Sequence, residues 1–257
     1  MAGYELHFGE EACLVGKNGS GAIFFSGCNL GCVFCQTYEI SQEGVGTEIS
    51  VEQLAEIMLE LQQKGGHNIN LVTPSHQVMA ILKALEIAVE QGLELPVVFN
   101  TSSYDRLETL RALEGIVDVY LADFKVWSEE VAEKYLRARD YPEVARKALK
   151  EMYRQVGNLV CNEQGLAVRG LLVRHLVLPE GLGGTKEILH FLKEEISPEV
   201  HLNLMGHYHP AGKALAYPPL DRHLKRHEYE EALEVATRLG FKNLDQTHRP
   251  LLELILL

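Results

Sequence analysis

Short apolar runs alternate along the chain with longer segments in which apolar residues recur at helical spacing. The short runs predict six β-strands, at residues 22–26, 69–73, 97–100, 117–124, 171–178 and 201–205. The longer segments predict helices at about 51–63, 77–91, 104–113, 142–156, 186–195 and 227–239. Ser50 suits the N-cap of the first helix, and Gly92 suits the end of the second. This alternation is typical of βα units around a parallel sheet.

The order of the elements fits either an open doubly wound sheet or a partial barrel, and periodicity does not distinguish them. In both architectures, functional residues gather where strands end and loops begin. Polar segments follow the predicted strands directly, at residues 28–32, 73–76, 100–103, 123–125, 179–181 and 205–209. We therefore expect one face of a single domain, residues 1–257, to carry the chemistry. We expect an extension over residues 1–20, a core over 21–205 and a C-terminal segment over 206–257.

The composition narrows the class of protein. Of the 257 residues, 46% are hydrophobic and 23% are charged, which is ordinary for a globular protein. The net charge of −12 disfavours binding to nucleic-acid phosphates or to anionic membrane surfaces. No apolar run is long enough for a membrane span, and the acidic N-terminal region does not resemble a signal peptide. We expect a cytoplasmic protein with no nucleic-acid or membrane partner.

Three of the five cysteines, Cys28, Cys32 and Cys35, form a C-x3-C-x2-C motif just after the first predicted strand. An odd number of cysteines with three so close together is no disulfide framework, and tight clusters in a reducing compartment usually bind metal. A [4Fe–4S] cluster normally takes four thiolates. Cys13 and Cys161 lack partner spacing, so three ligands are expected, and one iron stays open.

Two other interpretations of the motif stay open. One is a zinc site completed by His67 or His76, although structural zinc usually takes a second cysteine pair, which is absent from the sequence. The other is a chance spacing of three cysteines on a loop that contains Gly27 and Gly31.

The motif, with Phe34 before its last cysteine, resembles that of the radical S-adenosylmethionine (radical SAM) enzymes. Segments 7–11, 19–30, 70–76 and 120–125 resemble one branch, named for its similarity to pyruvate formate-lyase activating enzymes. The resemblance spans nearly the whole chain. It implies an α/β fold, a partial (β/α)6 radical SAM barrel in a single domain, and the activity of an oxidoreductase.

The resemblance also implies the cofactors. Cys28, Cys32 and Cys35 would hold a [4Fe–4S] cluster whose open iron is chelated by S-adenosylmethionine. One electron, from a donor such as flavodoxin or ferredoxin, would cleave a carbon–sulfur bond and give a 5′-deoxyadenosyl radical that abstracts hydrogen. Such chemistry is anaerobic, and the protein would supply binding, orientation and a dry cavity.

Three further residues receive a role from the resemblance near the cluster. Phe34 would approach the adenine, and a place in the core is the alternative. Ser75 and His76 follow the second strand, where the family usually has a glycine-glycine-glutamate-type motif for the methionine amine. This departure leaves them either as polar contacts to the cofactor or as the start of the next helix.

Two more strand ends match the activating enzymes. Asn100 and Thr101 lie where these enzymes hold polar groups near the cofactor and a monovalent cation. The usual acidic residue is Asn100 here, which weakens the case for the cation. Asp123 and Lys125 match an aspartate-x-lysine element and point to the same side of a strand, so they pair with each other or face the cavity. A surface ion pair is the alternative.

The last candidates lie toward the C-terminus. Arg174 is in the middle of a strand, where an unpaired guanidinium is costly, so it should meet a carboxylate. The family suggests that of S-adenosylmethionine, and Asp123 is the structural alternative. His175 points the other way, as a structural histidine. His207 and His209 would border the adenosyl or substrate pocket, or else lie on the surface.

The sequence leaves three alternative functions. The first is a glycyl-radical activating enzyme, whose substrate is a glycine Cα–H on a partner enzyme. The second is radical modification of a small molecule or a peptide, and no extra cysteine cluster points to a particular one. The third is a metal-binding scaffold without catalysis. Substrate identity would lie in loops such as 126–140 and 207–226, where the sequence shows no decisive chemistry.

Overall fold

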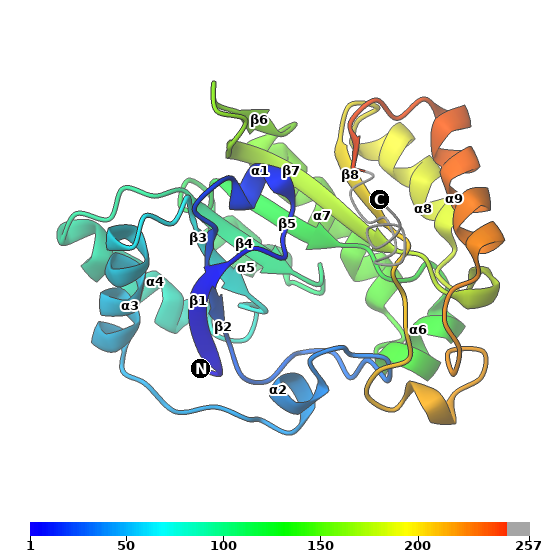
Figure 1. Ribbon diagram of the computed structural model, residues 1–257, viewed down its shortest axis with the longest axis horizontal. Coiled ribbons are helices and arrows are strands. Elements are labelled where there is room, and N and C mark those ends of the chain that lie inside the picture. The colour runs from blue at the N-terminus through cyan, green and yellow to red at the C-terminus, as the bar shows by residue number, and fades with distance from the viewer. Residues whose placement is uncertain (246–257) are drawn as a thin grey trace, which may run out of the picture.

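The computed structural model describes residues 1–245, which form one curved sheet with most of the helices on its outer side (Figure 1). Among these residues the sheet has nine strands in the order β1-β2-β3-β4-β5-β7-β8-β9, and β6 pairs with β7. The strands are β1 Gly3–His7, β2 Ser20–Phe24, β3 Ile69–Val72, β4 Val97–Thr101, β5 Val119–Asp123, β6 Val160–Cys161, β7 Ala167–Leu176, β8 His201–Met205 and β9 Leu244–Asp245. The neighbours from β2 to β9 along this path are parallel.

All six predicted strands are present, and their parallel pairing makes the fold a partial (β/α) barrel. In the described part of the chain the sheet runs from β1 at one edge to β9 at the other, so the barrel stays open between them. The expected core, residues 21–205, omits both edge strands. Residues 3–7 pair antiparallel with β2, and residues 244–245 pair with β8. Both strands are short and partly exposed, so their apolar pattern is weak.

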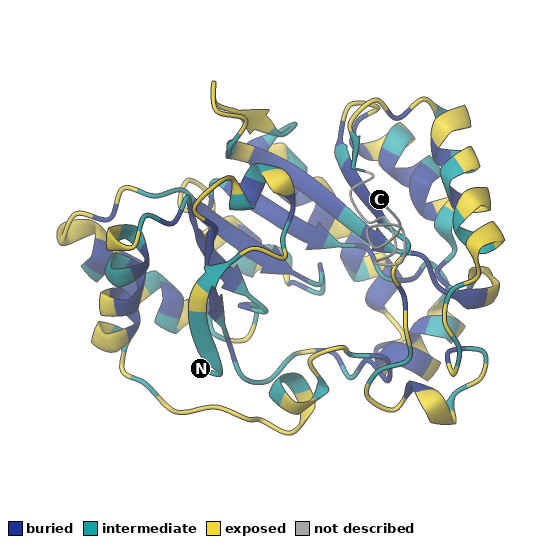
Figure 2. Ribbon diagram, viewed as in Figure 1, coloured by how far each residue is buried: buried dark blue, intermediate teal, exposed yellow. Residues whose placement is uncertain are grey.

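Most of the helices pack against the outer face of the sheet and leave their polar faces in solvent (Figure 2). The exceptions are α1, described below, and α2, which has no buried residue. The helices are α1 Ala12–Val15, α2 Tyr38–Gln42, α3 Val51–Gln63, α4 Val78–Glu90, α5 Leu107–Ala112, α6 Glu129–Leu136, α7 Tyr141–Val156, α8 Thr185–Phe191 and α9 Arg226–Leu239. The predicted cap of α3 is confirmed, because the Ser50 hydroxyl accepts from the Gln53 amide in a capping box. Gly92 takes the left-handed conformation after α4 (φ 95°), as its position predicts.

Three short helices, α1, α2 and α6, were not predicted, and α5 starts later than expected. Each of α1 and α2 has at most five residues, too few for a periodic apolar pattern to show. Helix α5 begins at Leu107 rather than at residue 104. Arg106 has an extended backbone (φ −72°, ψ 141°), so the helix cannot include it and starts at the next residue. In the described residues no helix is both long and apolar enough to cross a membrane.

Helix α1 lies on the inner side of the sheet and closes the amino end of the barrel. Along the strands, residues such as Phe99 and Tyr120 pack outward beneath the helices. Their neighbours Val98 and Leu121 belong to a separate inner cluster around Leu14 of α1, which is fully buried. The segment that the sequence analysis assigned to an extension is therefore part of the barrel interior.

We call α1 the α1 plug, because it closes the amino end of the barrel. Leu14→Ala should destabilise the protein, because it removes buried methyl groups and leaves a cavity between the α1 plug and the sheet. We expect a loss of about 2–5 kcal/mol in the free energy of unfolding, measured by urea denaturation. Leu215→Ala is the matched control, because the Leu215 side chain is 74% exposed. Equal losses in the two variants would contradict the role of α1 as a packed plug.

Candidate active site

The polar segments at the carboxyl ends of the strands line one cavity of about 400 Å³. Its size falls in the range of small-molecule sites. Its wall includes Cys28, Cys32, Phe34, Cys35, Thr73, Asn100, Thr101, Asp123, Lys125, Arg174, Met205 and His207, and its floor is formed by Glu10 and Glu11. The structure thus brings together most of the residues that the sequence analysis singled out.

All three motif cysteines lie on the loop after β2 and face this cavity. Cys32 is buried, and Cys28 and Cys35 are half-buried. Burial raises the pKa of Cys28, and it raises the pKa of Cys32 to about 12. Without a metal the Cys32 side chain is therefore a neutral thiol, and metal binding must displace its proton.

The donor set fits an iron–sulfur cluster better than zinc. A zinc ion needs side chains that converge on one point, and among residues 1–245 no three His, Cys, Asp or Glu side chains do so. His76 donates to the Ser26 carbonyl (2.7 Å), and His67 accepts from the Asn18 amide (3.1 Å). A [4Fe–4S] cluster binds each thiolate on its own iron, so the three sulfurs need only face a common cavity.

The cysteine loop is held by segments far away in the sequence. The amides of Gly31 and Val33 donate to carbonyls at the end of α6, those of Leu136 and Tyr135. The Val33 carbonyl in turn accepts from the Lys213 amide (2.7 Å). Phe34 packs edge-on against Tyr208 (6.3 Å between centroids). Phe34 is thus a core aromatic that also lines the cavity, which accommodates both interpretations of this residue.

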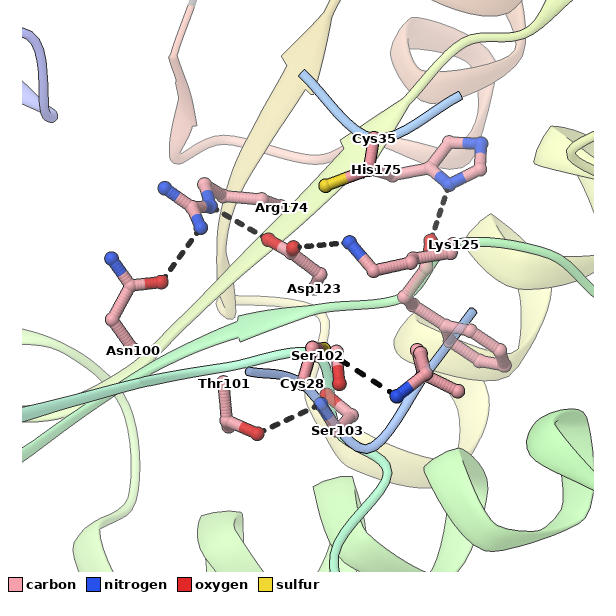
Figure 3. Close-up of polar contacts among 12 residues, drawn as sticks. Cys28, Cys35, Asn100, Thr101, Ser102, Ser103, Asp123, Lys125, Arg174 and His175 are labelled. Atoms are coloured by element: carbon pink, nitrogen blue, oxygen red, sulfur yellow. Dashed lines mark hydrogen bonds and ion pairs between the residues drawn. The ribbon is translucent and has the colours of Figure 1, made fainter. Parts of the chain in front are cut away.

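A network of partly buried charges also lines the cavity (Figure 3). The Arg174 guanidinium donates through Nε to Asp123 (2.7 Å), through Nη1 to Glu10 (2.9 Å) and through Nη2 to Asn100 (2.8 Å). The Lys125 ammonium bonds the other Asp123 oxygen (2.7 Å). Arg174 therefore meets the structural partner named as the alternative, and two cations balance two carboxylates.

These charges shift one another's pKa values. Burial alone would raise the pKa of Asp123, but the positive charges of Arg174 and Lys125 outweigh burial and lower the pKa to about 2. For Lys125 burial is the largest single effect and lowers the pKa, but Asp123, Cys32 and Tyr141 together outweigh burial and raise the pKa. Asp123, Lys125 and Arg174 are therefore ionised near neutral pH. The Asp123–Lys125 pair is partly buried and lines the cavity, so it is not a surface ion pair.

Glu10 is the member of this network that sequence reasoning missed. Its Oε1 accepts from the amides of Asn70 (3.3 Å) and Asn100 (3.1 Å), and burial raises its pKa. The next residue, Glu11, accepts from Asn203 of β8 (2.8 Å). Both residues belong to segment 7–11, which carried part of the family resemblance. Their place on the cavity floor depends on the α1 plug, which has no sequence pattern of its own.

The segment after β3 is strained and lies partly behind the cavity wall. Thr73 has a left-handed backbone (φ 59°), a costly conformation for a β-branched residue, and its amide donates to the Asn100 carbonyl (3.0 Å). In the described structure neither Ser75 nor His76 lines the cavity. The Ser75 hydroxyl contacts that of Thr101 (3.2 Å), which donates to the buried Asp105 carboxylate (2.6 Å). Asp105 was not predicted.

The histidines divide as follows. His207 and His209 are both exposed, but only His207 lines the cavity, and His209 faces the His223 ring (6.3 Å between centroids). His175 is fully buried, and its Nδ1 donates to the Phe124 carbonyl (2.7 Å) while Nε2 accepts from the Thr185 hydroxyl (2.8 Å). Its expected structural role is confirmed by these bonds.

Comparison with known proteins identifies the family. Residues 22–163 match the radical SAM superfamily. An uncharacterized protein of Methanocaldococcus jannaschii is 33% identical over 250 residues, which cover 93% of this chain and 67% of that protein. The chain therefore belongs to the radical SAM superfamily, whose members are enzymes that use a [4Fe–4S] cluster and S-adenosylmethionine.

Solved structures agree on the fold. Streptococcus suis SuiB bound to S-adenosylmethionine matches 90% of this chain and 50% of its own, with a TM-score of 0.60 and 14% identity. The [FeFe]-hydrogenase maturase HydG from Carboxydothermus hydrogenoformans matches 87% of this chain and 51% of its own, with a TM-score of 0.58 and 11% identity. The chain spans about half the length of these structures, so the likeness concerns the barrel.

Thr73→Gly should give a more stable protein than Thr73→Ala. Both variants remove the side chain beyond Cβ, but only glycine adopts the left-handed backbone of this position without strain. We expect a difference of about 1 kcal/mol in the free energy of unfolding, measured by urea denaturation. If the alanine variant were as stable as the glycine variant, the strain assigned to Thr73 would not exist.

His175 should make stability depend on pH. Burial lowers its pKa to about 4 from an ordinary value of 6.5. Between these values the unfolded chain binds a proton that the folded protein does not, so the free energy of unfolding falls as the pH decreases. We expect a loss of roughly 3 kcal/mol between pH 6.5 and pH 4, measured by urea denaturation.

His175→Asn is the control for this effect. The variant should be less stable at pH 7, because it loses the bond to Thr185, and its stability should decline less at acid pH. An equal decline in both proteins would assign the acid sensitivity to other groups.

Proposed function

We propose that this protein is a radical SAM enzyme that cleaves S-adenosylmethionine reductively at a cluster held by Cys28, Cys32 and Cys35. The observation that carries this proposal is the position of three thiols from one loop on the wall of a cavity that is also lined by partly buried charges. When bound, the cluster supplies the electron for cleavage, and the resulting 5′-deoxyadenosyl radical abstracts hydrogen. Membership of the superfamily supports both cofactors.

Lys125 would favour the ligating form of the cysteines. Its ammonium charge counteracts the effect of burial on the pKa of Cys32 and of Cys28. A positive charge near a thiol stabilises the thiolate, which is the form that binds iron. Because Asp123 pairs with Lys125, the same carboxylate sets where this charge lies.

Asp123, Asn100 and Thr101 would bind the polar parts of S-adenosylmethionine. Arg174 would hold the first two in place, since one N–H bond goes to each of them and one to Glu10. A guanidinium has five N–H groups, so two stay available for the carboxylate of the cofactor. Phe34 would lie beside the adenine. Contacts from Ser75, His76 and His209 stay predictions, and all three require movement toward the cavity.

The substrate we favour is a glycine Cα–H on a partner enzyme, because segments throughout the chain resemble the activating enzymes. Flavodoxin or ferredoxin would donate the electron in the cytoplasm, under anaerobic conditions. Radical modification of a peptide or a small molecule is the second candidate. The likeness to SuiB, solved also with its precursor peptide SuiA (TM-score 0.54), favours a peptide for this candidate.

The test is reconstitution with iron and sulfide under strict exclusion of oxygen. After reduction and addition of S-adenosylmethionine, the wild type should release methionine and 5′-deoxyadenosine, measured by chromatography. Cys32→Ala should lose this activity, because it removes a buried cluster ligand. Cys161→Ala should retain it, because Cys161 is exposed on β6 and does not line the cavity.

Metal analysis of the same samples distinguishes the proposed enzyme from a metal-binding scaffold without catalysis. About four iron and four sulfide per chain are expected for the wild type and for Cys161→Ala. Zinc without sulfide, together with no cleavage, would favour a metal-binding scaffold and overturn the proposal.

A further inference from the structure

Helix α2 brings a hydroxyl to one of the three motif cysteines. The Ser41 Oγ lies 3.1 Å from the Cys35 Sγ, within the range of a hydrogen bond to sulfur. We propose that Ser41 donates a hydrogen bond to the Cys35 thiolate when the cluster is bound, and that this bond raises the reduction potential of the cluster. Ser41 is thus a positioning residue for electron uptake. The inference rests on the proposed function, because it takes Cys35 as a cluster ligand.

The direction of the bond follows from the chemistry of the ligand. A free Cys35 thiol and the Ser41 hydroxyl can each donate to the other. A cysteine bound to iron has lost its proton, so its sulfur can only accept, and the hydroxyl must donate. The other acceptor within reach of this hydroxyl, the Tyr38 carbonyl, is farther away (3.5 Å). The negative sulfur is both nearer and the stronger acceptor.

The hydroxyl is held in place from both sides of the cysteine loop. The Ile40 carbonyl of α2 accepts from the Gly27 amide (3.0 Å), just before Cys28. The Gln42 side chain donates to the Leu30 carbonyl (2.8 Å), between the first two cysteines. Because α2 is tied to the loop at both points, Ser41 does not need to be reordered when the cluster changes its charge.

Such a bond acts on the potential because reduction adds negative charge to the cluster. Donors to the ligating sulfurs stabilise the reduced state, and hydrogen bonds of this kind are among the factors that set cluster potentials. Cys28 accepts from the Leu30 backbone amide (3.4 Å), a contact that no side-chain substitution removes. Thr37 lies farther from Cys35 (3.6 Å). Among the described side chains, Ser41 has the shortest hydroxyl contact to a motif cysteine.

The experiment is an anaerobic redox titration of the reconstituted protein, followed by visible absorbance and by the electron paramagnetic resonance signal of the reduced cluster. In Ser41→Ala, the ratio of reduced to oxidised cluster at a fixed potential should fall by up to tenfold, which is about 59 mV for one electron. Ser41→Thr keeps the hydroxyl and should stay close to the wild type. Thr37→Val is the matched control, and its potential should change much less.

The outcomes separate the two proposals. Wild-type protein that takes up no iron and sulfide would overturn the proposed function, and this inference with it. A normal cluster content with the same potential in Ser41→Ala and in the wild type would overturn the inference alone. If Ser41→Ala takes up the cluster poorly, the pair Ser41→Thr and Ser41→Val makes the same comparison at nearly equal volume. Equal potentials in that pair would also overturn it.

Discussion

The compensation of one partly buried positive charge organises the centre of this barrel. The Arg174 side chain lines the cavity and is only 17% exposed, so a guanidinium without partners would be unfavourable there. Its partners come from β5, from β4 and from the loop before α1, so a single side chain ties three separate parts of the chain to β7. Loss of one partner would leave an uncompensated charge, so the partners of Arg174 must keep their relative positions. These positions determine the shape of the cavity together with the sheet.

Two groups of side chains with different electrostatic character line the cavity. One group is the motif cysteines, of which Cys32 is buried, and its burial disfavours the thiolate until a metal displaces the proton. The other group is ionised and already balanced by its own opposite charges. Lys125 belongs to the second group, and its charge also acts on Cys32. The site is therefore prepared for a ligand that carries both positive and negative groups, as S-adenosylmethionine does.

The sequence predicted the regular parts of the structure well and the irregular parts poorly, for physical reasons. The six strands and the cap at Ser50 have strong local patterns, and so does the motif of Cys28 and its neighbours. The positions of Glu10 and Asp105 depend on tertiary packing, which leaves no periodic pattern in the sequence. His209 was selected because it follows a strand, yet the loop turns it outward after His207. Strand ends identified the correct face, but not which side chain of each segment reaches the cavity.

The α1 plug also sets an order for folding. Glu10 contacts a residue 164 positions away, and Glu11 contacts one 192 positions away. The segment that contains Glu10 and Glu11 can therefore take its final place only after β7 and β8 have joined the sheet. Contacts of such long sequence separation slow folding, because a large loop must close before they form. On the ribosome, the floor of the cavity would be synthesised before β7 and β8, yet it would be completed only after them.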